Sequence, residues 1–515
     1  MVLVVAIFAA PLIFATTTEA DIFCSKICVI MKFCYRIAAS ILELFSEFLK
    51  IPAIFLPKIT KNSHQWPFLT LFMPSLVFRC LIKSMKIFMK MRLQNAISLS
   101  AIIHCFIYVI FAANYIKTMH LSSLLTRFNE PETLKMAKLG RELRAKGIDI
   151  TDLSLGEPDF DTPDHIKEAA KKAIDDNYSH YTPVAGYLDL REAICFKLQR
   201  ENGLEYKPEQ VVVSTGAKQS IANTVLAIVD AGDEVIIPTP YWVTYSEIVK
   251  LAGGTVHLVK TSFEHGYKIT PEELEASINE KTKLFMFSTP CNPTGAVYSK
   301  AELAALAEVF RKYPQVFIMS DEIYEHINFT GHHESIAQFD FLKERVIIIN
   351  GLSKGYAMTG WRLGYIAAPV EIAKACDKIQ GQFTSGTNAV TQRAAIAALT
   401  GTMEPTQLMV KKFRERRDKV MQLVAEIPGI SCTVPPGAFY VFPDVKSYFG
   451  KQTPAGEVIH TADDLCMYFL NTAHVSAVTG KAFGEPNCIR ISFANSTANI
   501  EKGFAKIKEA LANLT

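Results

Sequence analysis

The middle of the chain, from about residue 211 to residue 400, alternates short apolar runs with amphipathic stretches. Apolar runs of roughly four to eight residues are typical of buried strands, whereas apolar residues spaced three and four positions apart indicate helices. Regular alternation of the two predicts an α/β fold, a mostly parallel central sheet with helices on both faces. The expected strands are residues 211–214, 234–237, 255–259, 283–287, 316–320, 346–349 and 363–368, with helices at 217–229 and 301–312 among those between them.

Both flanks of this region are also patterned. On the N-terminal side, helical spacing ends at Gly147, which suits a helix C-cap, and helix signals resume at Asp164, an expected N-cap. The last part of the chain mixes strands with helices, which predicts a smaller α+β domain. We expect an N-terminal arm at 119–163, a large domain at 164–403 and a small domain at 404–515. The flanking helices are expected at 134–146, 164–173, 188–201, 370–380, 387–400, 404–426, 461–470 and 497–513, with a short extended run at 148–155 and tail strands at 438–442, 475–478 and 488–494.

Residues 1–118 form a hydrophobic leader that differs in composition from the rest. They contain no glycine and carry 12 Lys and Arg against 4 Asp and Glu, whereas the remaining residues carry 42 against 47. Residues 96–115 lack Asp, Glu, Lys and Arg over 20 positions, which is enough for a membrane span. Three interpretations stay open: sequence upstream of a true start at Met119, a membrane anchor, or a targeting segment.

Charge and cysteine usage narrow the function classes. A net charge of +3 is too small to indicate binding to nucleic acid. The 11 cysteines are scattered, and none form the C-x-x-C pairs of a zinc site, so we expect no metal. Structural thiols in a reducing compartment are the simplest interpretation, which predicts a cytoplasmic protein. Association with a membrane is expected only if the leader is genuine.

The stretch Gly351-Leu-Ser-Lys-Gly-Tyr-Ala-Met-Thr-Gly-Trp-Arg362-Leu-Gly364 lies between two expected strands and carries the main chemical signal. Burial of Lys354 would lower its pKa, as an amine needs in order to form a Schiff base with an aldehyde. Ser353 and Arg362 are suited to a phosphate. An amine beside a phosphate cradle indicates pyridoxal 5'-phosphate, although a lone lysine is far more often a solvated loop residue.

Three further signals lie where expected strands end, the edge at which open α/β sheets bind ligands. After Gly216, the amides of Ala217 and Lys218 at a helix N-terminus would form an anion site. Trp242 offers a flat face to an aromatic ring, unless it is a core residue. Asn292, held between two prolines, is placed to donate to a phenolate oxygen, unless Pro290-Cys-Asn-Pro-Thr-Gly295 is a plain turn.

Two charged residues stand at apolar strands, Asp321 at the end of the strand 316–320 and Arg490 within the strand 488–494. Asp321, in Ser320-Asp-Glu-Ile-Tyr324, is expensive to bury unless it is paired, and a protonated pyridine nitrogen would pair it. Tyr324 would then share the cofactor's phenolic oxygen with Asn292. Arg490, in Cys488-Ile-Arg-Ile-Ser-Phe-Ala494, is expected to face a planar anion, with a structural salt bridge as the alternative.

Through these motifs taken together, the sequence resembles a class I aminotransferase of the fold type I pyridoxal-phosphate superfamily. The resemblance runs from Ser122 to Leu514 and rests on the lysine stretch, on Asn-Pro-Thr-Gly, on Asp-x-x-Tyr and on Arg-Ile-Ser-Phe. Through Gly156-Glu-Pro-Asp-Phe160 and Gly216-Ala-Lys-Gln219 it is most similar to the bacterial aspartate and prephenate aminotransferase branch.

The resemblance implies a role for each candidate residue. Lys354 would hold the cofactor as a Schiff base and carry the proton, Asp321 would keep the pyridine nitrogen protonated, and Tyr324 would tune the cofactor. Trp242 would stack on the ring, Asn292 would bond the phenolic oxygen, and Arg490 would grip the substrate's α-carboxylate near Gly156. The phosphate would be bound by Ala217, Lys218, Ser353 and Arg362, together with Tyr181 of a neighbouring subunit.

The substrate is less narrowly defined. Lys218 and Thr133 match positions that engage a distal carboxylate in the resembled branch, so the expected pair is aspartate with 2-oxoglutarate. Alternatives are a prephenate, aromatic or alanine aminotransferase, or a lyase of the same fold. A non-catalytic, membrane-tethered protein is disfavoured because Lys354, Asp321 and Arg490 are all present. The resemblance also implies a homodimer with shared active sites.

Overall fold

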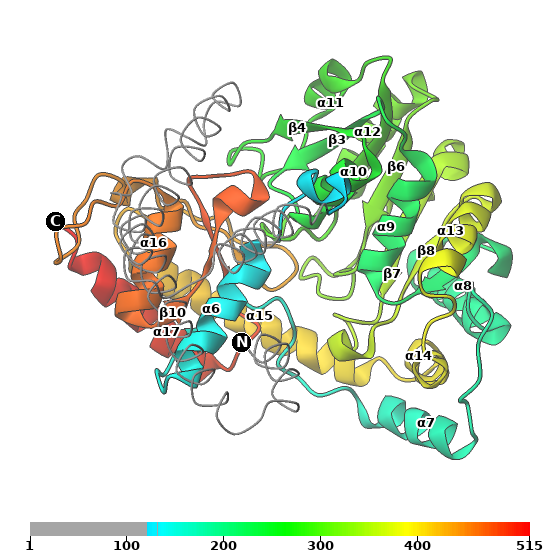
Figure 1. Ribbon diagram of the computed structural model, residues 1–515, viewed down its shortest axis with the longest axis horizontal. Coiled ribbons are helices and arrows are strands. Elements are labelled where there is room, and N and C mark those ends of the chain that lie inside the picture. The colour runs from blue at the N-terminus through cyan, green and yellow to red at the C-terminus, as the bar shows by residue number, and fades with distance from the viewer. Residues whose placement is uncertain (1–120, 131) are drawn as a thin grey trace, which may run out of the picture. The chain divides into compact units, whose positions relative to one another are not determined.

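The computed structural model describes the backbone of residues 121–130 and 132–515 (Figure 1). Residues Ser122–Thr515 form one compact unit. The predictions for residues 1–118 and for a start at Met119 lie outside the described residues. Within the described ranges, no helix is both long enough and apolar enough to cross a bilayer.

A seven-stranded sheet has the order β2-β8-β7-β6-β5-β3-β4. All neighbouring pairs are parallel except those of β8, which runs antiparallel to β2 and to β7, so the prediction of a mostly parallel sheet is confirmed. The inner strands are buried on both faces, as expected for a sheet covered twice. The strands are β2 (Val211–Ser214), β3 (Glu234–Thr239), β4 (Thr255–Lys260), β5 (Thr282–Ser288), β6 (Phe317–Asp321), β7 (Val346–Gly351) and β8 (Gly364–Ala367).

Two hydrophobic cores lie on the two faces of this sheet. Alternate residues of each strand enter opposite cores, so that Ile348 joins one core while Ile347 and Ile349 join the other. One face is covered by α7 (Asp164–Asp175), α8 (Leu188–Asn202), α12 (Lys300–Lys312) and α14 (Ala389–Thr400), and the other by α9 (Ala217–Ile228), α10 (Thr244–Ala252) and α13 (Val370–Phe383). A short helix, α11 (Pro271–Ser277), begins at a capping box formed by Thr270 and Glu273.

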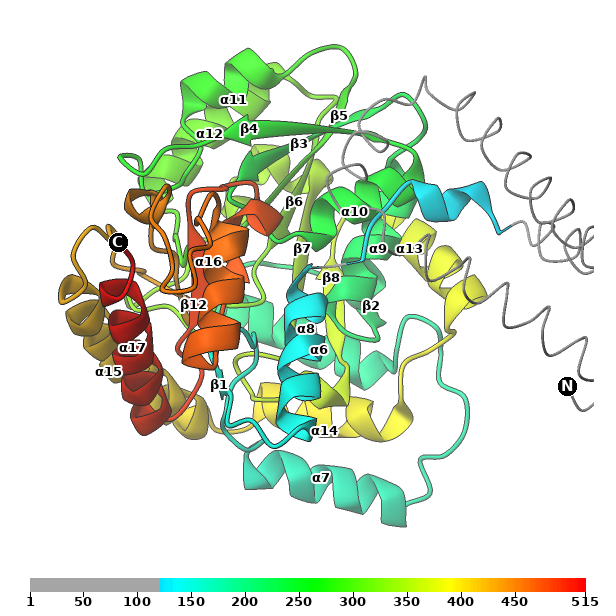
Figure 2. The same cartoon turned by 60° about the vertical axis from the view of Figure 1, so that its left-hand side comes forward.

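A third core lies among the elements near the C-terminus. Its antiparallel sheet has the order β11-β12-β9, and a separate parallel pair joins β1 to β10. The helices α15 and α17 lie side by side in both views (Figures 1 and 2). The elements are α6 (Glu132–Ala145), β1 (Thr151–Asp152), α15 (Glu404–Ala425), β9 (Tyr440–Val441), α16 (Ala462–Tyr468), β10 (Val475–Ser476), β11 (Val478–Thr479), β12 (Ile489–Ser492) and α17 (Thr497–Ala512).

The sequence-based element predictions differ from the structure at several points. The single strand expected at 475–478 is divided at Ala477, because β10 pairs with β1 while β11 pairs with β12. The helix expected at 461–470 ends at Tyr468 and continues as a π-helical turn. Pro163, not Asp164, occupies the N-cap of α7, and Asp164 is the first helical residue. The proposed arm, large domain and small domain stay predictions.

A buried ion pair supports the ends of β6 and β7. Lys197, 1% exposed, contacts Glu325, and Asn202 Nδ2 donates to the other carboxylate oxygen at 3.0 Å. Asn350 Nδ2 donates to Glu325 Oε1 at 2.8 Å, and Asn350 Oδ1 accepts from the Gly351 amide at 2.7 Å. Lys197 on α8 is therefore connected, through Glu325 and Asn350, to Gly351, the residue that begins the lysine stretch.

Replacing Lys197 with methionine is expected to destabilise the protein by about 3–5 kcal/mol, because the variant leaves the Glu325 carboxylate buried without its cation. Urea unfolding, followed by circular dichroism, measures the loss. Lys171→Met is the matched control, since its pair with Glu168 is solvent-exposed and contributes little. Equal stability of the two variants would contradict a role for the Lys197 pair.

Candidate active site

The lysine stretch leaves β7 and returns along β8 through a close backbone contact. A Cβ on Gly351 would lie 2.8 Å from the Cα of Gly364, so only glycine allows the two strands to meet there. Lys354 lies in the loop between them, and its Nζ donates to the Gly156 carbonyl at 2.5 Å. Burial lowers the pKa of this amine to about 8, and the nearby guanidinium of Arg490 acts in the same direction.

Asp321 ends β6 and is 3% exposed. Burial raises the pKa of its carboxyl group to about 6, although Tyr245 Oη donates to Oδ2 at 2.6 Å and the Ile323 amide to Oδ1 at 3.2 Å. Lys354 and Asp321 influence each other's pKa. Amine and carboxylate therefore belong to one electrostatic site, and a cation facing Asp321 would stabilise its charged form.

An anion cradle forms where α9 begins. Gly216 has φ +86°, and a Cβ there would lie 2.5 Å from Arg362 Nη2. A Cβ on Gly364 would lie 2.2 Å from the Ala217 amide nitrogen, so the two glycines allow Arg362 and β8 to approach the N-terminus of α9 closely. Ser353, the residue that precedes Lys354 in the sequence, is also buried. Backbone amides and a guanidinium around one space suit a phosphate.

Trp242 is half-buried, with one ring beside it and one cation over it. Tyr245 packs edge-on at a centroid distance of 5.7 Å, and Lys218 Nζ lies 4.9 Å from the indole centroid. Burial and the charge of Arg362 both lower the pKa of the Lys218 amine. Trp242 is thus linked through Tyr245 to Asp321, and through Lys218 to the N-terminus of α9.

Arg490 lies on β12, 3% exposed. Its Nη1 donates to Asn292 Oδ1 at 2.9 Å and its Nη2 to the Ser154 carbonyl at 2.7 Å, while Nε has no partner. No salt bridge of Arg490 occurs within the part of the chain that the structure describes, so the structural ion pair considered as an alternative is absent there. A buried guanidinium without a counter-ion is costly, and a bound carboxylate would neutralise it.

Tyr324, buried beyond the end of β6, completes the group. Its Oη lies 2.8 Å from Tyr440 Oη, and Lys354 Nζ lies 5.8 Å from its ring centroid. The Tyr440 ring in turn lies under Arg490, whose Cζ is 4.5 Å from the ring centroid. The tyrosine predicted to tune a cofactor is therefore connected to the arginine predicted to bind a substrate.

Two of the predicted site residues stay predictions. Tyr181 is 100% exposed and does not pack with this group in its own subunit. Thr133 lies in α6, and its side chain lies outside the described residues. The sequence predictions missed Tyr245, Ser154 and Tyr440. Tyr245 lies three positions after Trp242, and this spacing could have indicated that the two side chains are neighbours. Tyr440 lies in an apolar run, which gives no indication of a role in the site.

These residues fit pyridoxal 5'-phosphate. Lys354 would supply an amine of lowered pKa for the aldehyde, and Asp321 would supply a buried carboxylate for the ring nitrogen. The N-terminus of α9 beside Arg362 would supply the phosphate cradle. The Nε of the buried Arg490 is a donor without a partner among the described residues, and a further anion would satisfy it.

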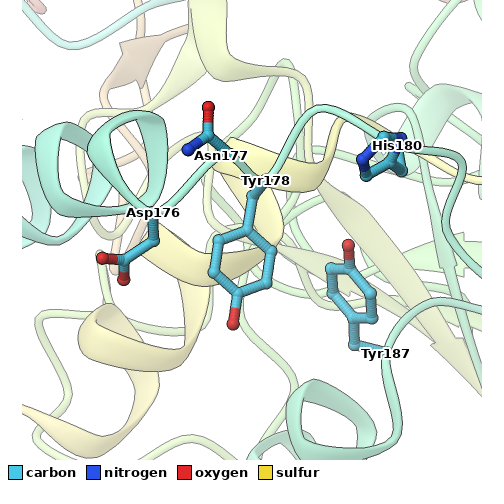
Figure 3. A pocket seen from close by; sticks show the side chains of 5 residues that line it. All are labelled: Asp176, Asn177, Tyr178, His180 and Tyr187. Carbon is cyan, nitrogen blue, oxygen red and sulfur yellow. The ribbon is translucent and has the colours of Figure 1, made fainter.

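A separate surface pocket of about 480 Å³ lies at the end of α7 (Figure 3). The rings of Tyr178 and Tyr187 approach each other edge-on at 6.0 Å, and Arg393 packs on both. None of the predicted active-site residues line this pocket. Its lining residues are Asp176, Asn177, Tyr178, His180 and Tyr187.

Comparison with known proteins identifies the family. Residues 148–507 match the model of "Aminotransferase class I and II". The chain is 45% identical over 391 residues to a probable aspartate/prephenate aminotransferase of Rhizobium leguminosarum bv. phaseoli, covering 75% of this chain and 98% of that protein.

Solved structures agree with this assignment. The aspartate aminotransferase of Rhizobium meliloti has a TM-score of 0.75 at 40% identity and covers 77% of this chain and 100% of its own. The aspartate aminotransferase of Thermus thermophilus with maleate has a TM-score of 0.71 at 36% identity and covers 76% and 100%. The chain therefore belongs to the class I and II aminotransferases, in the bacterial aspartate/prephenate-like branch, and is a pyridoxal-phosphate-dependent enzyme of fold type I.

Proposed function

We propose that the enzyme moves an amino group between L-aspartate and a 2-oxo acid, with 2-oxoglutarate as the acceptor. The observation that carries this proposal is a pair of cations, Arg490 and Lys218. Beyond the effect of burial, the charge of Arg490 lowers the pKa of the Lys354 amine directly. Arg362 also lowers that pKa, and it lowers the pKa of Lys218 as well. Arg490 is a buried guanidinium without a counter-ion, and Lys218 is a second, partly desolvated cation over Trp242. Two positive groups around one site favour a substrate with two carboxylates.

Pyridoxal phosphate supplies an electron sink for the electron pair of the substrate's Cα–H bond. In our proposal, Lys354 Nζ would bind the cofactor and would also take the proton that leaves the substrate's Cα. Its lowered pKa suits this task, because a general base works best when its pKa is near the operating pH. Asp321 holds the proton on the ring nitrogen, and Tyr245 keeps its carboxylate in place through Oδ2.

The remaining residues bind and orient. The amides of Ala217 and Lys218, with Ser353 and Arg362, would hold the phosphate. Trp242 would lie against the ring, while Asn292 and Tyr324 would bond the phenolic oxygen. Arg490 would bind the α-carboxylate beside the Gly156 backbone, with Asn292 Oδ1 fixing one edge of its guanidinium.

The distal carboxylate of aspartate would be recognised by the Lys218 ammonium, with Thr133 as a second contact. Aspartate or prephenate appears in the names of close relatives, and the similar Thermus thermophilus aspartate aminotransferase was solved with maleate, a dicarboxylate. Prephenate also carries two carboxylates, so a prephenate aminotransferase is the second candidate. Aromatic or alanine aminotransferase activity and a lyase reaction leave the second cation without a partner.

We further propose a homodimer with shared active sites. Support comes from the fully exposed ring of Tyr181, in the segment that also forms the surface pocket of Figure 3. A large side chain with no contact in its own subunit is suited to complete the phosphate cradle of a second copy. The proposed compartment is the cytoplasm, which agrees with six free thiols among the described residues.

Lys354→Ala is expected to lower turnover at least about a thousandfold, because the variant lacks both the covalent anchor and the group that moves the proton. Steady-state assays of purified protein measure the loss, and absorbance checks whether a bound cofactor chromophore remains. Lys171→Ala, on the exposed face of α7, serves as the control. Retained turnover in Lys354→Ala would refute the assignment of this residue.

Substrate choice is tested by single-turnover conversion of the bound cofactor with a panel of aspartate, glutamate, alanine, phenylalanine and arogenate, the amino form of prephenate. Aspartate is expected to react most efficiently, and Lys218→Gln should reduce kcat/KM for aspartate by roughly 10–100-fold, the effect of losing one charge-assisted hydrogen bond. Alanine should be affected much less. Equal losses for both amino acids would contradict distal recognition by Lys218, and faster conversion of arogenate would favour the second candidate.

The shared site is tested by mixing two defective variants, Lys354→Ala and Tyr181→Ala. A mixed dimer would contain one intact site, formed by Lys354 of one subunit and Tyr181 of the other, so co-expression should restore activity above either variant alone. Light scattering gives the oligomeric state, and differently tagged subunits allow mixed dimers to be purified. A monomer, or purified mixed dimers without restored activity, would contradict the proposal.

A further inference from the structure

Tyr440, on β9, is a buried residue at the point where three parts of the site meet. Its Oη lies 2.8 Å from Tyr324 Oη, and its ring lies under the Arg490 guanidinium at 4.5 Å. A Cβ on Gly156 would lie 2.6 Å from the same hydroxyl, so the backbone that accepts a hydrogen bond from Lys354 also packs against Tyr440. No role of Tyr440 follows from the motifs that identify the family.

The need for a hydroxyl at this position is not explained by packing. Tyr440 lies between Phe439 and Val441 in an apolar segment of the third core, where phenylalanine would fill almost the same volume. Burying a hydroxyl is unfavourable unless it is hydrogen-bonded. The only hydrogen bond of Tyr440 Oη among the described residues is the one with Tyr324.

The direction of this hydrogen bond follows from counting protons. A tyrosine hydroxyl has one proton to donate. If Tyr324 gave its proton to Tyr440, it would have none for the phenolic oxygen of the cofactor. We propose that Tyr440 is a positioning residue, whose hydroxyl donates to Tyr324 Oη and thereby directs the proton of Tyr324 toward the cofactor oxygen. This inference rests on the cofactor-binding role assigned to Tyr324 in the proposed function.

The charges around the two tyrosines favour this direction. Burial raises the pKa of both hydroxyls, and Arg490 lowers both. The pKa of Tyr324 nevertheless stays well above its usual value, whereas that of Tyr440, whose ring lies against Arg490, is raised less. Tyr324 is also influenced by Asp321, which raises its pKa and acts against ionisation. Lys354 Nζ lies near the Tyr324 ring at 5.8 Å. The more acidic of two hydrogen-bonded hydroxyls is the better donor, and a chain of such bonds strengthens each member.

Tyr440→Phe is the variant that tests the inference, since it removes the hydroxyl but keeps the ring under Arg490. A hydroxyl that donates to the cofactor's oxygen stabilises the form with more negative charge on that oxygen. Weaker donation is therefore expected to move the pH midpoint of the bound cofactor's visible absorbance upward, by roughly 0.3–1 pH unit. The absorbance is titrated in the absence of substrate, so that the readout does not depend on turnover.

Tyr468→Phe is the matched control. Tyr468 belongs to the same core, and its buried hydroxyl donates to the Ala510 carbonyl at 3.1 Å, away from the site. This variant loses a comparable hydrogen bond and should leave the midpoint unchanged. Unfolding of both variants, measured in parallel, separates a general loss of stability from an effect on the cofactor.

A double-variant cycle tests whether Tyr440 acts through Tyr324. Tyr324→Phe should raise the midpoint by itself, and adding Tyr440→Phe to it should cause no further shift. An unchanged midpoint in Tyr440→Phe, or a shift of full size on the Tyr324→Phe background, would overturn the inference. The absence of any bound-cofactor absorbance in the unmodified enzyme would instead count against the proposed function itself.

Discussion

The constraint on which this site depends is that charged groups are removed from water without a salt bridge to another residue in the part of the chain that the structure describes. Arg490 is a buried cation, Lys354 is a half-buried amine whose pKa is lowered to about 8, and Asp321 is a buried carboxyl group whose pKa is raised to about 6. Each departs from its ordinary state because burial penalises charge. A cofactor and a substrate of matching charge would supply the missing counter-charges.

The structure around the site satisfies its other polar groups and so holds the uncompensated ones in place. Tyr245 fixes the Asp321 carboxylate, and Ser154 and Asn292 hold two edges of the Arg490 guanidinium. At the ends of β6 and β7, Asn202 and Asn350 donate to the Glu325 carboxylate of the buried pair with Lys197. A buried charge that has its counter-charge in the protein serves the structure, whereas one without a counter-charge there is available to a ligand.

The topology of the sheet brings the protein groups that are proposed to bind ligands together at its carboxyl edge. Asp321 ends β6, Gly351 ends β7, and the N-terminus of α9 follows β2. The antiparallel strand β8 lies between β2 and β7, and its first residue, Gly364, faces the start of α9. The strand β12 of the separate three-stranded sheet contributes Arg490, which bonds to Asn292 in the same group. Residues from separate parts of the sequence thus share one space.

Most elements and the central chemistry could be predicted from the chain itself. The period-2 pattern of the strands places Ile347, Ile348 and Ile349 on alternating faces, and the motif around Lys354 identifies the reactive amine, because both signals are local in sequence. Local pattern also predicted Gly147 at a helix end, where its φ is +83°. It failed at 475–478, where pairing with distant strands, not propensity, divides the segment.

Only the tertiary structure reveals that Arg490 has no salt bridge among the described residues, that Tyr245 contacts Asp321 and that Tyr324 is hydrogen-bonded to Tyr440. Those properties depend on partners up to 336 positions away, and burial or the absence of a counter-charge is defined by the packed neighbours and not by the residue type.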